Sequence, residues 1–429
     1  MSTTEIINKP IALKLRVLQV ARLAIASIVR FFCRLYYGNE GEKIPPITDE
    51  ILKLPAIEVA KKIRNKAITS VEVLETCIAR IKDVNSALNC FVEDRFELAL
   101  KEAKEADELI RSGSKTADQW ESHNHIHGRT NNPYNTTRIV GGSSGGEGSI
   151  QAAAASIFGI GSDIGGSIRM PCYFNGIFGH KPSKYIISGT NASKLRLDEP
   201  VDIKKVNFFY QFSNDVPMTD PVDPDIIAAM KKVVEFIKVQ HKIDAEEKRI
   251  PLQKSMAIWM AMMSSNTKFG ELIMEKYTKG NCLKEIVKNA FGLSGNTLIA
   301  LFTALYGAGD IGEQKMNHFV KLRQDLVNTF TEMLGDNGVF LFPSHPTPAL
   351  YHNEALFRPF NFSYTALINL LGMPSTSVPL GLGSEGLPIG IQVVANYDQD
   401  RLCLAVAEEL DRAFGGWVEP QNSVVPTTT

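Results

Sequence analysis

The chain has 429 residues, of which 44% are hydrophobic and 22% are charged, as in a soluble globular protein. Its formal net charge of -1 excludes the basic excess that RNA- and DNA-binding proteins usually carry, so no nucleic acid partner is expected. The six cysteines form no CxxC pair, so the sequence indicates neither a zinc site nor a disulfide framework.

The N-terminal segment, residues 1–37, is predicted to associate with a membrane. Residues 11–37 contain five basic residues and no acidic one. On a helix, apolar residues cover one side and four arginines occupy the other: Arg16, Arg22, Arg30 and Arg34. This pattern favours a helix lying on an anionic membrane surface. No uncharged run reaches the ~18 residues of a confident span, but a spanning anchor with snorkelling arginines stays open.

The next part of the chain is predicted to be a short linker followed by helices. Residues 38–48 are rich in turn-forming residues. Apolar residues at three- and four-residue spacing predict helices over 49–111, with a helix start at Thr69 and Ser70 and a break at Asn85 and Ser86. Residues 112–140 are polar and irregular.

The rest of the chain alternates helices with strands. We expect an alanine-rich helix over about 147–157, an amphipathic helix over 224–240, mostly helix over 254–335 and a last helix over 398–414. The expected strands are Ile157–Ile160, 203–212, 339–346, 377–382 and 390–395. Interleaved strands and helices predict an α/β fold, and we expect one large domain over 49–420.

Two segments rich in glycine and serine stand out, GGSSGGEG at 141–148 and SDIGGSIRMP at 162–171. Consecutive glycines let backbone N–H groups converge and let a substrate approach closely. The amides from Ile164 to Ser167 could point at one oxygen, as in an oxyanion hole, where losing one donor costs about 10²–10³ in rate. A serine beside such amides outlines an acyl-transfer site, although a serine after glycines is often only a helix cap.

The stretch from 141 to 183, GGSSGGEGSIQAAAASIFGIGSDIGGSIRMPCYFNGIFGHKPS, resembles the signature of the amidase signature family. More narrowly, several motifs look like the fatty-acid amide hydrolase branch of that family, especially its second type: GRTNNPYN, HKPS, FPSHP, RPFNFSYTALINLLGMPS, GLPIGIQVVA and AFGGWV. The similarity runs from about residue 40 to 418. It implies the amidase-signature fold, a mixed central β-sheet flanked by helices.

The resemblance also implies the chemistry, which is cleavage of lipid amides by a serine–cis-serine–lysine triad without a metal or an organic cofactor. The family's nucleophile matches Ser167, and its bridging serine, on the amide side of a cis peptide bond, matches Ser143. The oxyanion amides match Ile164, Gly165, Gly166 and Ser167. Supporting positions match Ser144, Asp163 and Arg169; Asp163 is expected to fix its loop, and Arg169 to anchor an ion pair.

No catalytic lysine is identified, because the segment that carries it in the resembled family has no counterpart here. The chain looks shortened near 113–120 and again near 188–194, and the lone Lys115 matches no family motif. Since a serine needs a base to take its proton, we expect hydrolysis to be severely impaired in this form. The same omissions would also fit a non-catalytic membrane-associated protein that binds lipid amides or partners, or a truncated isoform or gene model. Loss of core strands would expose apolar edges.

Two competing chemistries stay open. The histidines of HNHIH, His123, His125 and His127, would share one face of a strand and could bind zinc. His180 is the histidine nearest to Ser167 after it in sequence and could form a Ser–His–Asp site, although HKP looks like a structural turn. The expected location is an intracellular membrane, with the endoplasmic reticulum and lipid droplets as candidates, and a homodimer is among the expected assemblies.

Overall fold

The computed structural model describes residues 3–38, 40–91, 95–108, 122–124, 128–184, 195–264, 279–290, 294, 301 and 312–420. Side chains of residues 3–16 and of a few other helix and strand ends are not described. Three expectations therefore lie outside the described residues: the shortened regions near 113–120 and 188–194, Lys115, and the side chains of HNHIH.

A six-stranded mixed sheet forms the centre of the molecule. Its order is β3-β7-β8-β6-β4-β5. β4 runs parallel to β5 and β6, and the other neighbours are antiparallel. The strands are β3 Gly179–Lys181, β4 Asn207–Tyr210, β5 Glu246–Glu247, β6 Gly338–Pro343, β7 Ser375–Leu382 and β8 Pro388–Ala395, and a separate pair joins β1 His123–Asn124 to β2 Gly128–Arg129.

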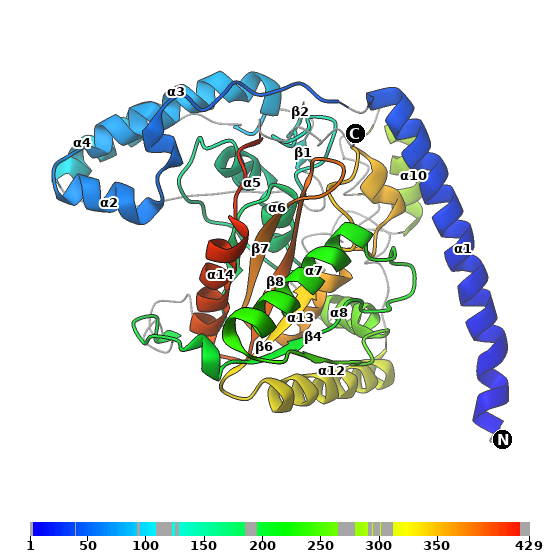
Figure 1. Ribbon diagram of the computed structural model, residues 1–429. Helices are drawn as coiled ribbons and strands as arrows, with labels where there is room; N and C mark the ends of the chain where they lie inside the picture. The colour runs from blue at the N-terminus through cyan, green and yellow to red at the C-terminus, as the bar shows by residue number, and fades with distance from the viewer. Residues whose placement is uncertain are drawn as a thin grey trace, which may run out of the picture.

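Helices cover both faces of this sheet (Figure 1). On one face, Val339 and Leu341 of β6 pack in a core with α7 Pro224–Phe236 and α14 Asp400–Phe414. On the other, Phe340 and Phe342 pack with α8 Ser255–Ser264, α12 Glu313–Leu334 and α13 Ser363–Leu371. The alternation of successive β6 side chains between two cores explains why this strand is apolar throughout. The expected α/β architecture with a mixed sheet flanked by helices is confirmed.

The remaining helices lie around this centre. They are α1 Thr3–Tyr37, α2 Ala56–Arg64, α3 Ser70–Leu88, α4 Phe96–Glu108, α5 Gly145–Ala152, α6 Arg169–Phe174 and α10 Lys279–Ala290, with short turns η1 Glu50–Lys53, η3 Ile203–Lys205, η4 Ile237–His241 and η5 Glu354–Phe357. Helices α2, α3 and α4 project to one side of the body, and α1 runs along another (Figure 1).

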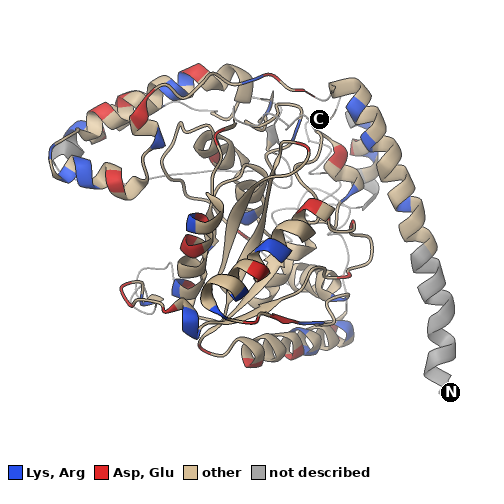
Figure 2. Ribbon diagram, viewed as in Figure 1, with Lys and Arg blue, Asp and Glu red and all other residues tan. Residues whose placement is uncertain are grey.

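Helix α1 is attached to the body through its arginines. Arg22 is buried and pairs with Asp220 at 2.8 Å, and Arg30 pairs with Glu385 at 2.7 Å. These two arginines are therefore not free to meet an anionic surface, contrary to the sequence expectation. Figure 2 shows few charged positions along residues 17–37 of α1, all of them basic. Among the described residues, no helix is both long and apolar enough to cross a bilayer.

The predicted start of α3 is confirmed, but its predicted break is wrong. Thr69 accepts the N–H of Glu72, and the Glu72 carboxylate accepts the N–H of Thr69, which completes a capping box. The helix continues past Asn85 to Leu88 and ends at Asn89, which has a left-handed backbone. The Asn85 side chain accepts the N–H groups of Cys90 and Phe91, so it closes the helix from within its last turn.

Other differences lie around the glycine–serine segments. The predicted alanine-rich helix begins earlier and ends earlier, as α5. The strand predicted at Ile157–Ile160 is wrong, because no described strand pairs with those residues. The HKP segment is not a turn, since His180 and Lys181 belong to β3 and pair with β7.

Candidate active site

The two glycine–serine segments meet in space. Gly141 has φ 77°, a left-handed backbone that glycine tolerates, and the peptide bond between Gly142 and Ser143 is cis. Ser144 stands at the N-cap of α5, and its backbone N–H donates to the carbonyl oxygen of Ser167 at 3.1 Å. This bond brings the first segment directly against the residue predicted as nucleophile.

Asp163 organises the second segment. Its carboxylate accepts the backbone N–H groups of Gly166 at 2.9 Å, Ile168 at 3.2 Å and Arg169 at 3.3 Å. The Arg169 side chain pairs with the same carboxylate at 2.9 Å. Burial would raise the pKa of Asp163, but the charge and hydrogen bonds of Arg169, with a hydrogen bond from Asn369, lower it to about 2. Asp163 is thus a carboxylate that holds the loop and has no proton to exchange near neutral pH.

Arg169 is fully buried and links the loop to the central sheet. Its guanidinium donates to the side-chain oxygen of Gln392 on β8 at 2.8 Å and to the carbonyl of Thr365 at 3.0 Å. It also donates to the side-chain oxygen of Asn369 at 2.5 Å. With Asp163 in place, this buried cation has acceptors on several sides, as a buried charge requires.

The backbone carbonyl groups of residues 164–166 all accept hydrogen bonds. The indole of Trp259 donates to the carbonyl of Ile164 at 3.3 Å, and the hydroxyl of Thr365 donates to that of Gly165 at 2.8 Å. The carbonyl of Gly166 accepts the N–H of Met170 at 2.8 Å. Fixed carbonyls orient the amides of the same peptide units.

The amides of the loop fall into two groups. The N–H of Gly166 already donates to Asp163, so in this conformation it has an acceptor inside the protein. The N–H groups of Ile164, Gly165 and Ser167 make no hydrogen bond within the described part of the chain. Three backbone donors, that of Ser167 and those two and three positions before it, are therefore available to a substrate oxygen.

Ser143 and Ser167 are both half-buried, and neither hydroxyl has a hydrogen-bond partner among the described residues. The only deeply buried lysine in that part of the chain is Lys181, whose ammonium donates to the carbonyl of Pro182 at 2.8 Å. Burial lowers the pKa of Lys181 to about 8, with the positive charge of Arg169 acting in the same direction. No lysine of the described ranges hydrogen bonds to either serine.

The Ser–His–Asp alternative finds no support in this geometry, whereas the zinc alternative rests on HNHIH side chains outside the described residues. Both ring nitrogens of His180 are engaged elsewhere, with Thr376 at 2.8 Å and with Asp400 at 3.1 Å. His180 therefore fastens β3 to α14 and does not bond Ser167. Across the described residues, no group of three or more histidine, cysteine, aspartate or glutamate side chains could hold a metal ion.

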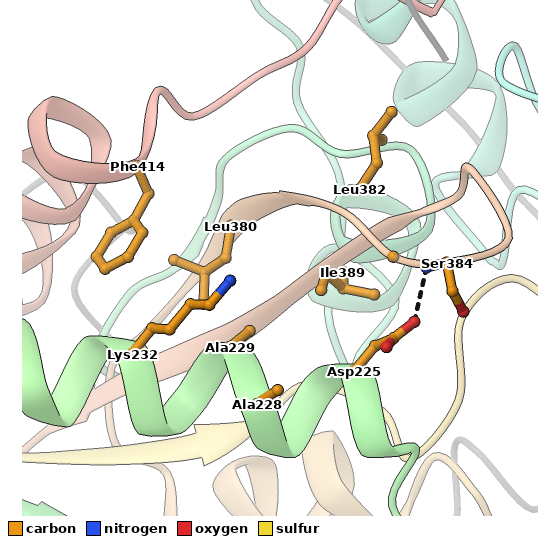
Figure 3. Close-up of a pocket in the computed structure, with 10 residues that line it drawn as sticks. Asp225, Ala228, Ala229, Lys232, Leu380, Leu382, Ser384, Ile389 and Phe414 are labelled. Atoms are coloured by element: carbon orange, nitrogen blue, oxygen red, sulfur yellow. Dashed lines mark hydrogen bonds between the residues drawn. The ribbon is translucent and has the colours of Figure 1, made fainter. Parts of the chain in front are cut away.

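A surface cavity of about 190 Å³ lies between α7 and the β7–β8 hairpin (Figure 3). Asp225 at its rim accepts the backbone N–H of Ser384 at 2.7 Å, and Leu380, Ile389 and Phe414 contribute apolar walls. None of the residues predicted for catalysis lines it. The cavity is therefore separate from the glycine–serine site.

Two residues of α13 support the loop, and the sequence did not predict this role for them. Thr365 and Asn369 stand one helical turn apart, and Asn369 donates to the carbonyl of Asp163 at 2.7 Å and to its carboxylate at 2.8 Å. Both lie in the RPFNFSYTALINLLGMPS motif, which was noted only for its family resemblance. The spacing of four residues places both polar side chains on one face of a helix, and this pattern could have indicated a shared contact.

The amidase family model matches residues 113–196 and 204–404 of the chain. Fatty-acid amide hydrolase 2-A of Danio rerio is 37% identical, in an alignment that covers 89% of this chain and 93% of that protein. Fatty-acid amide hydrolase 2 of Homo sapiens is 35% identical, in an alignment that covers 87% of this chain and 92% of that protein.

A solved structure of a fatty acid amide hydrolase superposes with a TM-score of 0.64 over 86% of each chain. Its sequence identity is 20%, so this likeness concerns the fold. The sequence and structure comparisons thus agree with the architecture described above.

Proposed function

This chain belongs to the amidase family, an amide-hydrolysing family, and we propose that it cleaves the amide bond of a lipid amide to give a fatty acid and an amine. The substrate class rests on the relatives that align over most of the chain, which are named fatty-acid amide hydrolases 2. The single observation that carries the reaction type is the set of three unpaired backbone amides in the loop of Ser167.

Ser167 is the nucleophile and Ser143 the proton relay. The Ser167 oxygen bonds to the amide carbon while its proton passes to the Ser143 oxygen, and the Ser143 hydroxyl gives its own proton to the amide nitrogen. The carbonyl oxygen takes up negative charge, which the N–H groups of Ile164, Gly165 and Ser167 stabilise. Collapse of this tetrahedral species breaks the C–N bond, and the nitrogen, already protonated through Ser143, leaves as the amine. Water then cleaves the acyl ester on Ser167, releasing the fatty acid and restoring the hydroxyl.

The part of the chain that the structure describes offers no terminal base for the proton relay, and we expect turnover to be impaired. No described lysine bonds to Ser143, and the Danio alignment spans 494 positions, more than the 429 residues of this chain. That relative therefore has internal segments without a counterpart here, in keeping with a domain over 49–420 shortened near 113–120 and 188–194. Loss of the base from a serine hydrolase triad can cost ~10⁶ in kcat, with roughly 10³–10⁴ over water remaining.

Residues 1–37 act as a membrane-associating segment joined to the domain by the linker 38–48. The part of α1 that faces away from the body is apolar and includes Phe32 at 61% and Leu35 at 66% exposure. Since Arg22 and Arg30 are paired with the body, apolar contact is the main driving force for binding. The membrane is intracellular, with the endoplasmic reticulum and lipid droplets as the two candidates.

The catalytic proposal is tested with the purified chain and a long-chain fatty acid amide, with released fatty acid followed by mass spectrometry. A slow turnover that is lost in Ser167→Ala is expected, together with labelling of wild type by a fluorophosphonate probe. Equal labelling of Ser167→Ala would contradict the nucleophile. Substrate binding that is unchanged in Ser167→Ala, with no turnover in wild type, would instead identify a non-catalytic lipid-amide-binding protein.

Membrane association is tested separately by flotation with phosphatidylcholine vesicles, with and without phosphatidylserine. Wild type is expected to float with both, and the double variant Phe32→Glu/Leu35→Glu is expected to stay at the bottom of the gradient. Ile57→Glu, at a position of similar exposure on α2, serves as the matched control. Flotation only with phosphatidylserine would show that basic residues, and not the apolar face, bind the membrane.

A further inference from the structure

The segment between α5 and the Asp163 loop has the form of a strand without a neighbour. Residues 158–163 contain no turn or bend and no left-handed residue. Phe158 and Ile160 are 68% and 58% exposed. At the alternate positions, a Cβ on Gly159 would lie 2.1 Å from the Glu147 carboxylate, and one on Gly161 would lie 2.4 Å from the Ser144 hydroxyl. Successive residues thus face opposite sides, the period of an extended strand.

The backbone of this segment is unpaired. Within the described structure, the amides and carbonyls of residues 159–162 make no hydrogen bond. Hydrogen bonds are present on either side of these residues. The carbonyl of Phe158 accepts from the Ser156 hydroxyl at 2.8 Å, and the carbonyl of Asp163 accepts from the Asn369 side chain. A continuous row of free donors and acceptors is a template for another extended chain.

The segment also lacks the features by which proteins protect an open strand edge. Residues 156–162 read SIFGIGS, with no lysine, no acidic residue and no proline. Ile164, which lies two residues beyond this segment, is also exposed, at 49%. No charge on this edge repels an identical edge. Each copy offers backbone donors and acceptors that can pair with those of the other copy.

We propose that residues 158–162 form a strand-pairing surface for a second copy of this chain. The two copies run antiparallel about a two-fold axis at Ile160, so that Ile160 lies opposite its own counterpart and Phe158 lies opposite Ser162 of the other copy. A two-fold arrangement satisfies both edges at once and closes the assembly as a dimer. The pairing covers Phe158 and Ile160 and adjoins the loop that carries Ile164.

The proposal is tested by sedimentation velocity of the full chain over a concentration series. Because the apolar face of α1 can also cause association, the measurements use the Phe32→Glu/Leu35→Glu background. A monomer–dimer equilibrium is expected, and Ile160→Lys is expected to raise its dissociation constant at least tenfold. Ile57→Lys, at a residue 60% exposed, is the control and leaves the equilibrium unchanged. Circular dichroism establishes that the variants are folded.

A second measurement tests the register. Residues opposite each other in antiparallel strands have Cα atoms about 4.5–5.5 Å apart, which suits a disulfide. Ile160→Cys is therefore expected to form an intermolecular disulfide on mild oxidation, and Val239→Cys, at an exposed position on η4, is not. A monomeric chain at every concentration, or a dimer unaffected by Ile160→Lys, would overturn the proposal. Both readouts are independent of hydrolysis, so they separate this inference from the catalytic one.

Discussion

The hydroxyl of Thr365 donates to the carbonyl of Gly165 at 2.8 Å, across 200 positions of sequence. This bond orients the peptide unit between Gly165 and Gly166, and thereby the loop that presents its amides to the substrate. Thr365 is fully buried. It is a positioning residue that acts through the loop.

Thr365→Val keeps the shape of the side chain and removes the hydroxyl. We expect the rate of Ser167 labelling by a fluorophosphonate to fall about tenfold, the effect of one hydrogen bond worth about 1–1.5 kcal/mol. Thr365→Ser, which retains the donor, should recover most of the rate. An equal loss in both variants would contradict this assignment, because Thr365→Ser keeps the hydroxyl that donates to Gly165.

Asp163→Asn removes one partner of a buried ion pair and leaves Arg169 without its anion. We expect the free energy of unfolding to fall by about 3–5 kcal/mol, measured by urea denaturation. Glu50→Gln breaks the exposed pair with Lys53 and should cost at most about 1 kcal/mol. A comparable loss in both variants would mean that the burial of the Asp163 pair has no energetic consequence.

The contribution of the Asp163 carboxylate to the stability of the fold should depend on pH in the acid range. Because its pKa is lowered to about 2 in the folded state, the stabilisation is complete above the unfolded value near 3.8 and is lost as the pH falls toward 2. The stability difference between wild type and Asp163→Asn should therefore shrink across this interval. A difference that stays constant down to about pH 2 would contradict the lowered pKa.

The local parts of the site could be predicted from sequence, and the long-range parts could not. Dense glycine and serine identified the segments of Ser143 and Ser167 because their backbone geometry depends on nearby residues. The support from Thr365 and Asn369 comes from about 200 positions away, and no local pattern links the two. For Ile157–Ile160, hydrophobicity alone predicted a strand, but a strand also needs a partner, and the described chain supplies none.

Gly166 should be intolerant of any side chain. Its φ is 120°, and a Cβ there would lie 2.0 Å from the Thr365 hydroxyl oxygen and 2.5 Å from the Thr365 Cβ. Gly381 has φ 94° with no atom within 4 Å of an added Cβ, so Gly381→Ala isolates the cost of a side chain on such a backbone, about 1–2 kcal/mol. Gly166→Ala should lower stability well beyond Gly381→Ala in urea denaturation. Equal losses would show that the loop moves away from Thr365 at no cost.

Lys181 should make the stability depend on pH in the alkaline range. Its pKa is about 8 in the folded state and near 10.5 when exposed, so between these values the unfolded chain binds the additional proton. Wild type should then gain about 2–3 kcal/mol relative to Lys181→Met between about pH 8 and about pH 10. Lys204→Met, at an exposed lysine, is the control and should show no such change. A wild-type curve parallel to that of Lys181→Met would mean that the buried ammonium keeps its proton, held by Asp163 and Asp400, whose charges raise the pKa of this lysine.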